Sequence, residues 1–249
     1  MLADRLTTSH SGRIAPTVHL ACTAKLELVD FVAAELLCWR DQPERPATDA
    51  ETKLTEYLCD HLNHAAYFSS VWSHVQFRTE TGDETRGERK IDLSIKPCGA
   101  VLIIGGRRHT CFDVLFPIEC KRLPTPKGKD RDEREYVTAE PRTTGGVQRF
   151  KLGHHGASHT FAAMIGYVQE HSCSHWTRQI NSWIRDLSAE PGSVWNASDS
   201  LHPLNDGSAS GLCKLRSQHR RAGGLKDCEL RHLWIRMDRD DDRKNPHSQ

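Results

Sequence analysis

Two apolar segments of the chain each carry an acidic residue in their interior. The first reads Lys-Ile-Asp-Leu-Ser-Ile over residues 90–95, and the second reads Phe-Pro-Ile-Glu-Cys-Lys-Arg-Leu over residues 116–123. Both are typical of buried strands. A carboxylate buried there without a partner is costly, so each acid must be paired, hydrogen-bonded or bound to a cation. If the two strands are neighbours, their acids can share one site with a divalent metal ion and a water molecule.

The spacing within Glu119-Cys120-Lys121 places a lysine beside the second acid. Side chains alternate along a strand, so Glu119 and Lys121 share one face and Cys120 points to the other. Asp92 on an adjacent strand would meet Glu119 across the ladder. Oxygen ligands at about 2.1 Å suit Mg²⁺, and Mn²⁺ can replace it. The main-chain carbonyl of Cys120 is a further candidate ligand.

Asp92 together with Glu119-Cys120-Lys121 resembles the PD-(D/E)xK nuclease superfamily, whose motif is an acid on one strand and (D/E)-x-K on the next. Ile91 stands where the superfamily usually has a proline. The resemblance extends over residues 48–170. It implies an α/β, restriction-endonuclease-like fold with a mixed central sheet flanked by helices. It also implies a metal-dependent endonuclease.

The C-terminal part carries a second resemblance. Ser217-Gln218-His219-Arg220 and the strand-like residues 230–237 are similar to the closing segment of uncharacterised bacterial restriction-like proteins. This similarity implies antiviral defence against foreign DNA, with other subunits of a defence complex as partners.

A helix is predicted from Thr48 to about Ala66, and Thr48 with Glu51 fits a capping box at its start. At 100° per residue, Glu51 shares the face of the buried residues, whereas Glu56 points away. The buried stripe is Leu54, Leu58, Leu62 and Ala65. The resemblance implies that Glu51 is a catalytic residue and metal ligand. That Glu51 only caps its helix remains an equal alternative.

The rest of the chain predicts one α/β domain over residues 17–237. Further helices are expected over residues 18–40, 147–152, 158–169 and 174–187. Further strands are expected over residues 71–79, 100–104, 112–121, 212–217 and 230–237, with a Gly105-Gly106 turn between the 100–104 and 112–121 strands. A long loop or flap is expected over residues 124–145, and another loop over residues 188–211. Residues 1–16 are a flexible start and residues 238–249 a disordered polar tail.

The basic residues are unevenly distributed, although the net charge of the 249 residues is only +1. They concentrate in residues 121–134 and 214–236, which could line one nucleic-acid cleft or form ordinary solvated surfaces. The candidate nucleic-acid contacts are Lys127, Lys129, Gln148, Arg149, His219, Arg220 and Arg221. DNA is favoured over RNA as the ligand.

Three smaller features around this region have competing interpretations. Gln148 and Arg149 begin a helix whose amides would suit a phosphate, but an exposed polar first turn is slightly favoured. His154 and His155 could bind phosphate or move a proton, but a surface loop is the favoured interpretation. Tyr136 in the flap could stack on a base.

Nine scattered cysteines, with no Cys-x-x-Cys pair, favour reduced thiols and a cytoplasmic protein. No apolar run approaches the roughly 20 residues that span a membrane. Zinc held by His171, Cys173 and His175, with Cys213, Cys228 and His219 as further partners, is a minor alternative because structural zinc sites usually have tighter pairs. A Walker A loop, a GxSxG elbow and a GxGxxG loop are all missing from the sequence.

These observations favour a Mg²⁺-dependent nuclease that hydrolyses phosphodiester bonds in DNA, acting as a homo-oligomer or in a hetero-complex. The alternative is a non-catalytic nucleic-acid-binding or assembly subunit with a nuclease-like fold. The complete set of two acids and a lysine counts against that alternative.

Overall fold

The computed structural model describes residues 23–83, 86–99, 101–104, 106–128, 131–139, 145–204 and 210–237. Its centre is a seven-stranded mixed sheet in the order β1-β2-β5-β6-β9-β8-β7. The strands are β1 (Val75–Gly82), β2 (Lys90–Pro97), β5 (Phe116–Leu123), β6 (Phe161–Val168), β7 (His202–Pro203), β8 (Leu212–His219) and β9 (Cys228–Arg236). The predicted flexible start and polar tail lie outside the described residues.

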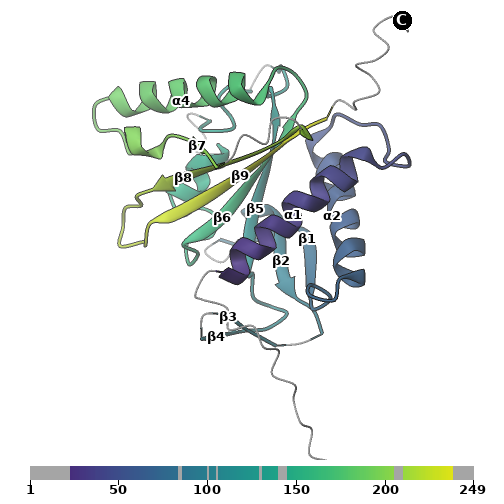
Figure 1. Cartoon of the computed structure of the whole chain (residues 1–249). Helices are drawn as coiled ribbons and strands as arrows, with labels where there is room; N and C mark the ends of the chain where they lie inside the picture. Colours follow the sequence, from purple (N-terminus) through teal and green to yellow (C-terminus); the bar gives the residue numbers. More distant parts are fainter. Residues whose placement is uncertain are drawn as a thin grey trace, which may run out of the picture.

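Helices cover both faces of this sheet (Figure 1). They are α1 (Thr23–Asp41), α2 (Glu51–Phe68), α3 (Gly146–Lys151) and α4 (Cys173–Ala189), with a short 3₁₀ turn η1 (Ala197–Asp199). Helices α1 and α2 lie on one side and α4 on the other (Figure 1). The predicted α/β class with a mixed sheet is therefore confirmed for the described part of the chain.

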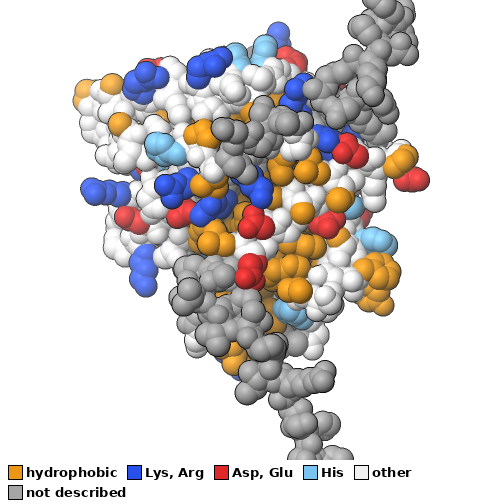
Figure 2. All heavy atoms as spheres, in the orientation of Figure 1, with side chains coloured by type: hydrophobic (Ala, Val, Ile, Leu, Met, Phe, Trp, Pro, Cys, Tyr) orange, Lys and Arg blue, Asp and Glu red, His pale blue; other side chains and the backbone are white. Residues whose placement is uncertain are grey.

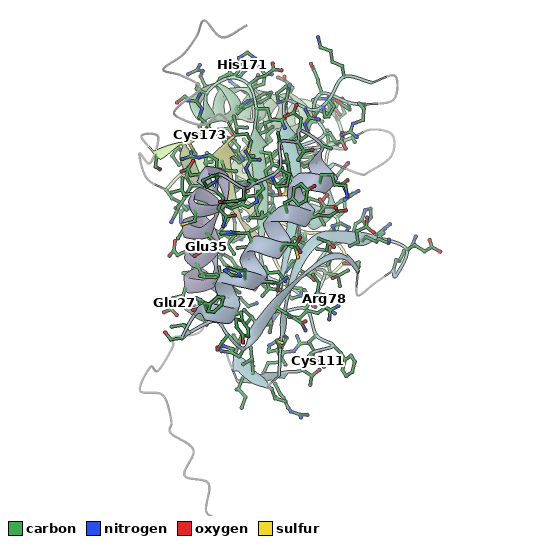
Figure 3. All side chains as sticks on the ribbon, turned by 90° about the vertical axis from the view of Figure 1, so that its right-hand side faces the viewer. Glu27, Glu35, Arg78, Cys111, His171 and Cys173 are labelled. Atoms are coloured by element: carbon green, nitrogen blue, oxygen red, sulfur yellow. A yellow bond between two sulfur atoms is a disulfide. The ribbon has the colours of Figure 1, made fainter. Side chains whose placement is uncertain are left out.

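Two apolar cores fill the spaces between the layers. On α2, Leu54, Leu58 and Leu62 are fully buried against the sheet, as the helical periodicity predicts. Where α1 meets α2, Glu35 lies 2.9 Å from His61 Nε2 (Figure 3). On the opposite face, Ile180 and Ile184 of α4 pack into the second core.

Strand β6 corrects the helix predicted over residues 158–169. All eight residues Phe161–Val168 are buried, and the strand runs parallel to both β5 and β9. A strand covered on both faces has a continuous apolar run instead of alternation, so its pattern does not distinguish it from a buried helix. At Gly166 an added Cβ would lie 2.4 Å from Trp234 Cδ1, so this strand can approach β9 closely only with glycine.

The segment after β2 also differs from the prediction. Residues 102–104 do not pair with β5, the strand that carries Glu119 and Lys121. They form β3 (Leu102–Ile104), which pairs with β4 (Arg107–His109) in a separate two-stranded sheet. Strand β5 then begins at Phe116 rather than at residue 112, and β1 begins at Val75 rather than at residue 71.

The expectation that the cysteines are all free is wrong for one pair. Cys173 at the start of α4 and Cys213 in β8 form a disulfide across 40 residues of sequence. Their sequence spacing gives no sign of this, because the packing of α4 against β8 creates the contact.

Figure 3 places Cys173 beside His171 at one end of the molecule and Cys111 at the other. Among the described residues, no helix is long and apolar enough to cross a membrane.

Candidate metal and catalytic site

The ammonium of Lys121 is the point at which three carboxylates meet. Its Nζ lies 3.3 Å from Glu51 Oε1, 3.3 Å from Asp92 Oδ2 and 2.9 Å from Glu119 Oε1. Helix α2 supplies Glu51, strand β2 supplies Asp92, and β5 supplies both Glu119 and Lys121. The fold thus brings together the four residues that the sequence predicts for one site.

Glu51 is the first residue of α2, and its carboxylate points into this site rather than onto its own helix. The N-cap residue is Ala50 and makes no side-chain cap, while Thr48 Oγ1 accepts a hydrogen bond only from the Ala50 N–H. Glu51 Oε2 instead accepts the Arg122 N–H at 2.9 Å. The predicted capping box is therefore wrong, and so is the alternative in which Glu51 serves only as a cap.

Asp92 interrupts the ladder between β2 and β5. The two strands pair antiparallel from Ile95 opposite Phe116 to Leu93 opposite Ile118. Beyond this pair, Asp92 Oδ2 accepts the Cys120 N–H at 2.9 Å. Burial and the nearby charge of Glu119 raise the pKa of Asp92 to about 6, against the opposing effect of Lys121. The raised pKa of Asp92 therefore reflects its burial first and its acidic neighbour second.

Cys120 lies between Glu119 and Lys121 on β5, and its side chain and its carbonyl group have different surroundings. Its side chain is fully buried on the opposite face, as the strand alternation predicts. Its carbonyl oxygen accepts a hydrogen bond from Lys121 Nζ at 2.9 Å. The carbonyl thus lies at the site, where the sequence places it as a candidate ligand.

Glu119 is completely buried and is surrounded by cationic and histidine side chains. Its Oε1 lies 2.5 Å from Arg149 Nη1 and 2.9 Å from Lys121 Nζ, and its Oε2 lies 3.1 Å from His155 Nδ1. Burial alone would raise the pKa of Glu119, but Lys121, His155 and Arg149 outweigh it and lower the pKa to about 2. Glu119 is therefore ionised throughout the neutral range.

The contact between Glu119 Oε2 and His155 Nδ1 is close but is not aligned as a hydrogen bond. Both atoms are buried, and neither has a hydrogen-bond partner among the described residues. A buried carboxylate oxygen without an aligned hydrogen-bond donor is uncommon in proteins, and a bound ion is one explanation for it. Glu119 Oε2 is therefore a candidate ligand atom.

His155 is a functional candidate that the sequence names but ranks below a surface loop, and the surface-loop interpretation is wrong for it because its side chain is buried. It is buried below β5, in a turn whose Gly153 and Gly156 have φ of +67° and +58°. The Gly156 N–H donates to Asp83 Oδ2, and its carbonyl accepts from Arg221 Nη1. The two glycines were the available signal, since they permit the tight reversal that returns His155 to Glu119.

Helix α3 brings Arg149 to the site but offers no free amides to a phosphate. The N–H groups of Gly146, Val147 and Gln148 donate to the carbonyls of residues 135–137. The side chain of Gln148 is buried, and its Oε1 accepts the Ala139 N–H at 3.5 Å. The predicted phosphate-binding amides, the nucleic-acid contact by Gln148 and the exposed first turn are all wrong for this reason.

Two of the predicted basic-segment contacts are structural residues. Arg221 is buried, and its guanidinium donates to the carbonyls of Gly156, His159 and Lys226. His219 faces the core because alternate residues of β8 point inward, and its pKa is lowered, chiefly by burial. It belongs to a buried chain of hydrogen bonds formed by Tyr136, His232, Ser217, His219 and Asp199.

Tyr136 is also buried, so it cannot stack on a base. Its hydroxyl accepts the Trp234 Nε1–H at 2.7 Å and lies 2.8 Å from His232 Nδ1. Lys127 and Arg220 are exposed, as a nucleic-acid contact requires. Lys129 lies outside the described residues.

A pocket of about 240 Å³ opens beside the acids. It is lined by Glu51, Thr52, Thr55, Glu56, Thr79, Glu80 and Asp92. Glu56, expected to point away, lies on the same pocket, but its carboxylate pairs with Lys53 Nζ at 2.6 Å. The lining oxygens are the ligand type that Mg²⁺ prefers.

The donor atoms are oxygens of the type that a hard divalent ion prefers, but cationic side chains lie against them. In the part of the chain that the structure describes, no three His, Cys, Asp or Glu side chains are placed to hold a metal ion together. Lys121 contacts all three carboxylates and Arg149 contacts Glu119. Lys121 and Arg149 would therefore compete with a metal ion for the oxygens that they contact. The zinc alternative is contradicted, because Cys173 and Cys213 are bonded to each other.

No protein-family model matches the chain, and no match was found among the curated proteins or the solved structures.

Proposed function

We propose that the protein is a Mg²⁺-dependent nuclease that hydrolyses phosphodiester bonds, with DNA favoured over RNA as the substrate. One observation carries this proposal. Carboxylates from a helix and two adjacent strands converge on a single buried lysine, beside a pocket lined by further oxygens. The acid on β2 and the Glu-x-Lys on β5 follow the order of the PD-(D/E)xK motif, which supports a restriction-endonuclease-like fold.

The charge of the cluster supports a cation-binding role. Three carboxylates and one ammonium carry a formal charge of −2, which the Arg149 guanidinium reduces to −1. Uncompensated charge in a partly buried site is costly unless a further cation offsets it.

Each residue has a distinct role in this proposal. Asp92, Glu119 and Glu51 would hold the ion, with the carbonyl of Cys120 as a further ligand. The bound ion would lower the pKa of a water molecule and neutralise charge on the scissile phosphate. Lys121 would orient that water and stabilise the charge that develops on the phosphate oxygens. Mn²⁺ would substitute for Mg²⁺ because it accepts the same oxygen ligands.

The defence role in this proposal rests on the two resemblances alone. We infer an enzyme of bacterial defence that works as a homo-oligomer or within a hetero-complex, and the scattered cysteines are the basis for placing it in the cytoplasm. The exposed Lys127 and Arg220 would contact the phosphate backbone of the substrate.

A second candidate function is a non-catalytic subunit that binds nucleic acid or assembles with a partner. The observation in its favour is that Lys121 and Arg149 already neutralise Glu119, so the protein can keep its fold without a metal.

A cleavage assay separates the two functions. Plasmid DNA, linear DNA and RNA are incubated with the protein and Mg²⁺, Mn²⁺ or EDTA. The nuclease proposal predicts cleavage of DNA with either metal and none with EDTA. If the protein binds DNA but cleaves it with neither Mg²⁺ nor Mn²⁺, the non-catalytic subunit is favoured.

A further inference from the structure

Arg149 is the most exposed of the groups that contact Glu119. Its side chain is 23% exposed, whereas those of Lys121 and His155 are 6% and 2% exposed. Its guanidinium contacts only Oε1 of the carboxylate, the oxygen that Lys121 also contacts. Arg149 can therefore reach solvent without disturbing the contact between His155 and Oε2.

We propose that Arg149 couples nucleic-acid binding to metal binding at this site. Without nucleic acid, its guanidinium stays on Glu119 Oε1 and neutralises the ligand. A phosphodiester of the nucleic acid draws the guanidinium away, and the metal ion takes its place on Oε1 beside Lys121. This inference rests on the proposed nuclease function and concerns the regulation of that same site.

The backbone around Arg149 supports a movement of its side chain alone. The N–H groups that open α3 are bound to the carbonyls of residues 135–137, and the Arg149 carbonyl accepts the N–H groups of His154 and His155. These backbone hydrogen bonds hold both ends of α3 in place, so the Arg149 side chain can move without the helix. Arginine forms planar, two-pronged contacts with carboxylates and phosphates alike, so exchange between the two costs little in geometry.

The surroundings of Glu119 support a carboxylate that stays in place when Arg149 leaves. Lys121 Nζ lies 2.9 Å from Oε1 and His155 Nδ1 lies 3.1 Å from Oε2, and neither contact involves Arg149. The turn that carries His155 is clamped at Gly156 by Asp83 and Arg221.

The energetics make the two binding events cooperative. Removing Arg149 leaves Lys121 to offset three carboxylates, and this larger excess of negative charge is unfavourable in a buried site. Arg149 therefore leaves Glu119 readily only when a phosphate receives the guanidinium and a metal ion replaces it. Each ligand then raises the affinity of the other by the same factor, which for typical couplings is roughly 5-fold to 150-fold.

Calorimetric titration with Ca²⁺ tests the coupling without cleavage, because the readout is metal affinity. The wild type, Arg149→Met, Arg149→Lys and Arg122→Met are each titrated alone and with a short DNA duplex. Arg122→Met is the matched control. The substitution also removes one positive charge near the site, but the Arg122 side chain donates a hydrogen bond to Gln169 and does not contact Glu119. Thermal melts identify any variant that does not fold.

The proposal predicts a different pattern for each protein. In the wild type, the duplex raises Ca²⁺ affinity roughly 5-fold or more. Arg149→Met binds Ca²⁺ more tightly than the wild type without the duplex, and the duplex then adds little. Arg149→Lys keeps a cation on Glu119, so its affinity without the duplex stays low. Arg122→Met retains the wild-type response to the duplex.

Other results overturn the inference. An equal effect of the duplex in the wild type and Arg149→Met would show that Arg149 does not carry the coupling. If Arg149→Met does not fold, Arg149→Lys provides the test. Tight Ca²⁺ binding by Arg149→Lys without the duplex would also show that a cation at this position does not hold back the metal ion. The absence of Ca²⁺ binding in all four proteins would reject the metal site and this inference with it. Metal-dependent cleavage without coupling would reject the inference alone.

Discussion

Lys121 holds its ammonium against three carboxylates, so its substitution separates metal binding from chemistry. Lys121→Ala is expected to lose cleavage and to keep or increase metal affinity, because an ammonium competes with the metal for the same oxygens. Lys121→Arg is expected to restore little activity, since a planar guanidinium does not replace a compact charge. Calorimetry with Ca²⁺ and a plasmid cleavage assay measure the two effects. A loss of Ca²⁺ affinity in Lys121→Ala as complete as that in Asp92→Ala would reject this division of roles.

Glu51 and Glu56 are a matched pair on α2. Glu51→Gln is expected to lower activity by roughly 10-fold or more, because it removes a charge that contacts Lys121 and the Arg122 N–H. Glu56→Gln is expected to be near wild type, because Glu56 pairs only with the exposed Lys53. Cleavage rates and thermal melts are compared for both variants. Equal activity in the two variants would exclude Glu51 from the site.

The residues of the site were predictable to different degrees. Strand alternation is local, so the shared face of Glu119 and Lys121 follows from their spacing. The position of Glu51 followed from helical periodicity, although its role in a capping box did not. The contacts of Arg149 and His155 with Glu119 depend on how α3 and the following turn pack below β5, which no local pattern encodes.

At the scale of the elements, helices exposed on one side were predicted well, and the strand buried on both sides was not. The stripes of α2 and α4 repeat with the helical period because their outer faces contact water. Strand β6 lacks such a contrast, since neighbouring layers cover both its faces. The β3–β4 hairpin was missed because its strands are only three residues long.

The close approach of β6 to β9 makes a prediction about stability. Gly166→Ala is expected to lower the free energy of unfolding by about 1–3 kcal/mol, because its Cβ would lie 2.4 Å from Trp234 Cδ1. Gly87→Ala is the control, since nothing lies within 4 Å of its added Cβ. Urea denaturation measures both. A wild-type midpoint for Gly166→Ala would mean that the strands have room at this position.

At the scale of the whole molecule, the positive charge is distributed unevenly. On the face drawn in Figure 2, most Lys and Arg side chains gather over the half that carries α4, β8 and β9. The basic segments seen in the sequence contribute both exposed and buried residues to the fold. Composition could not separate Arg220, which is exposed, from Arg221, which clamps the turn after α3.

The exposed basic residues Lys127 and Arg220 predict a salt-dependent affinity for DNA. Arg220→Glu and Lys127→Glu should each reduce the slope of log affinity against log salt concentration, by about 0.9 for every phosphate that the protein no longer neutralises. Fluorescence anisotropy with Asp92→Ala protein in Ca²⁺ measures binding without cleavage. Arg221→Glu is expected to destabilise the fold instead, because it breaks three hydrogen bonds to carbonyls. An unchanged slope in both surface variants would place the DNA on another face.

The central claim is that Asp92 and Glu119 form a metal-dependent hydrolytic site. Its most direct test is the Mg²⁺-dependent cleavage of DNA by Asp92→Ala and Glu119→Ala, with circular dichroism to verify that each variant folds. We expect both folded variants to lose activity by roughly 10²-fold or more, because they no longer have the charge stabilisation that the bound metal supplies. Cleavage at the wild-type rate by either folded variant would contradict the assignment of the site.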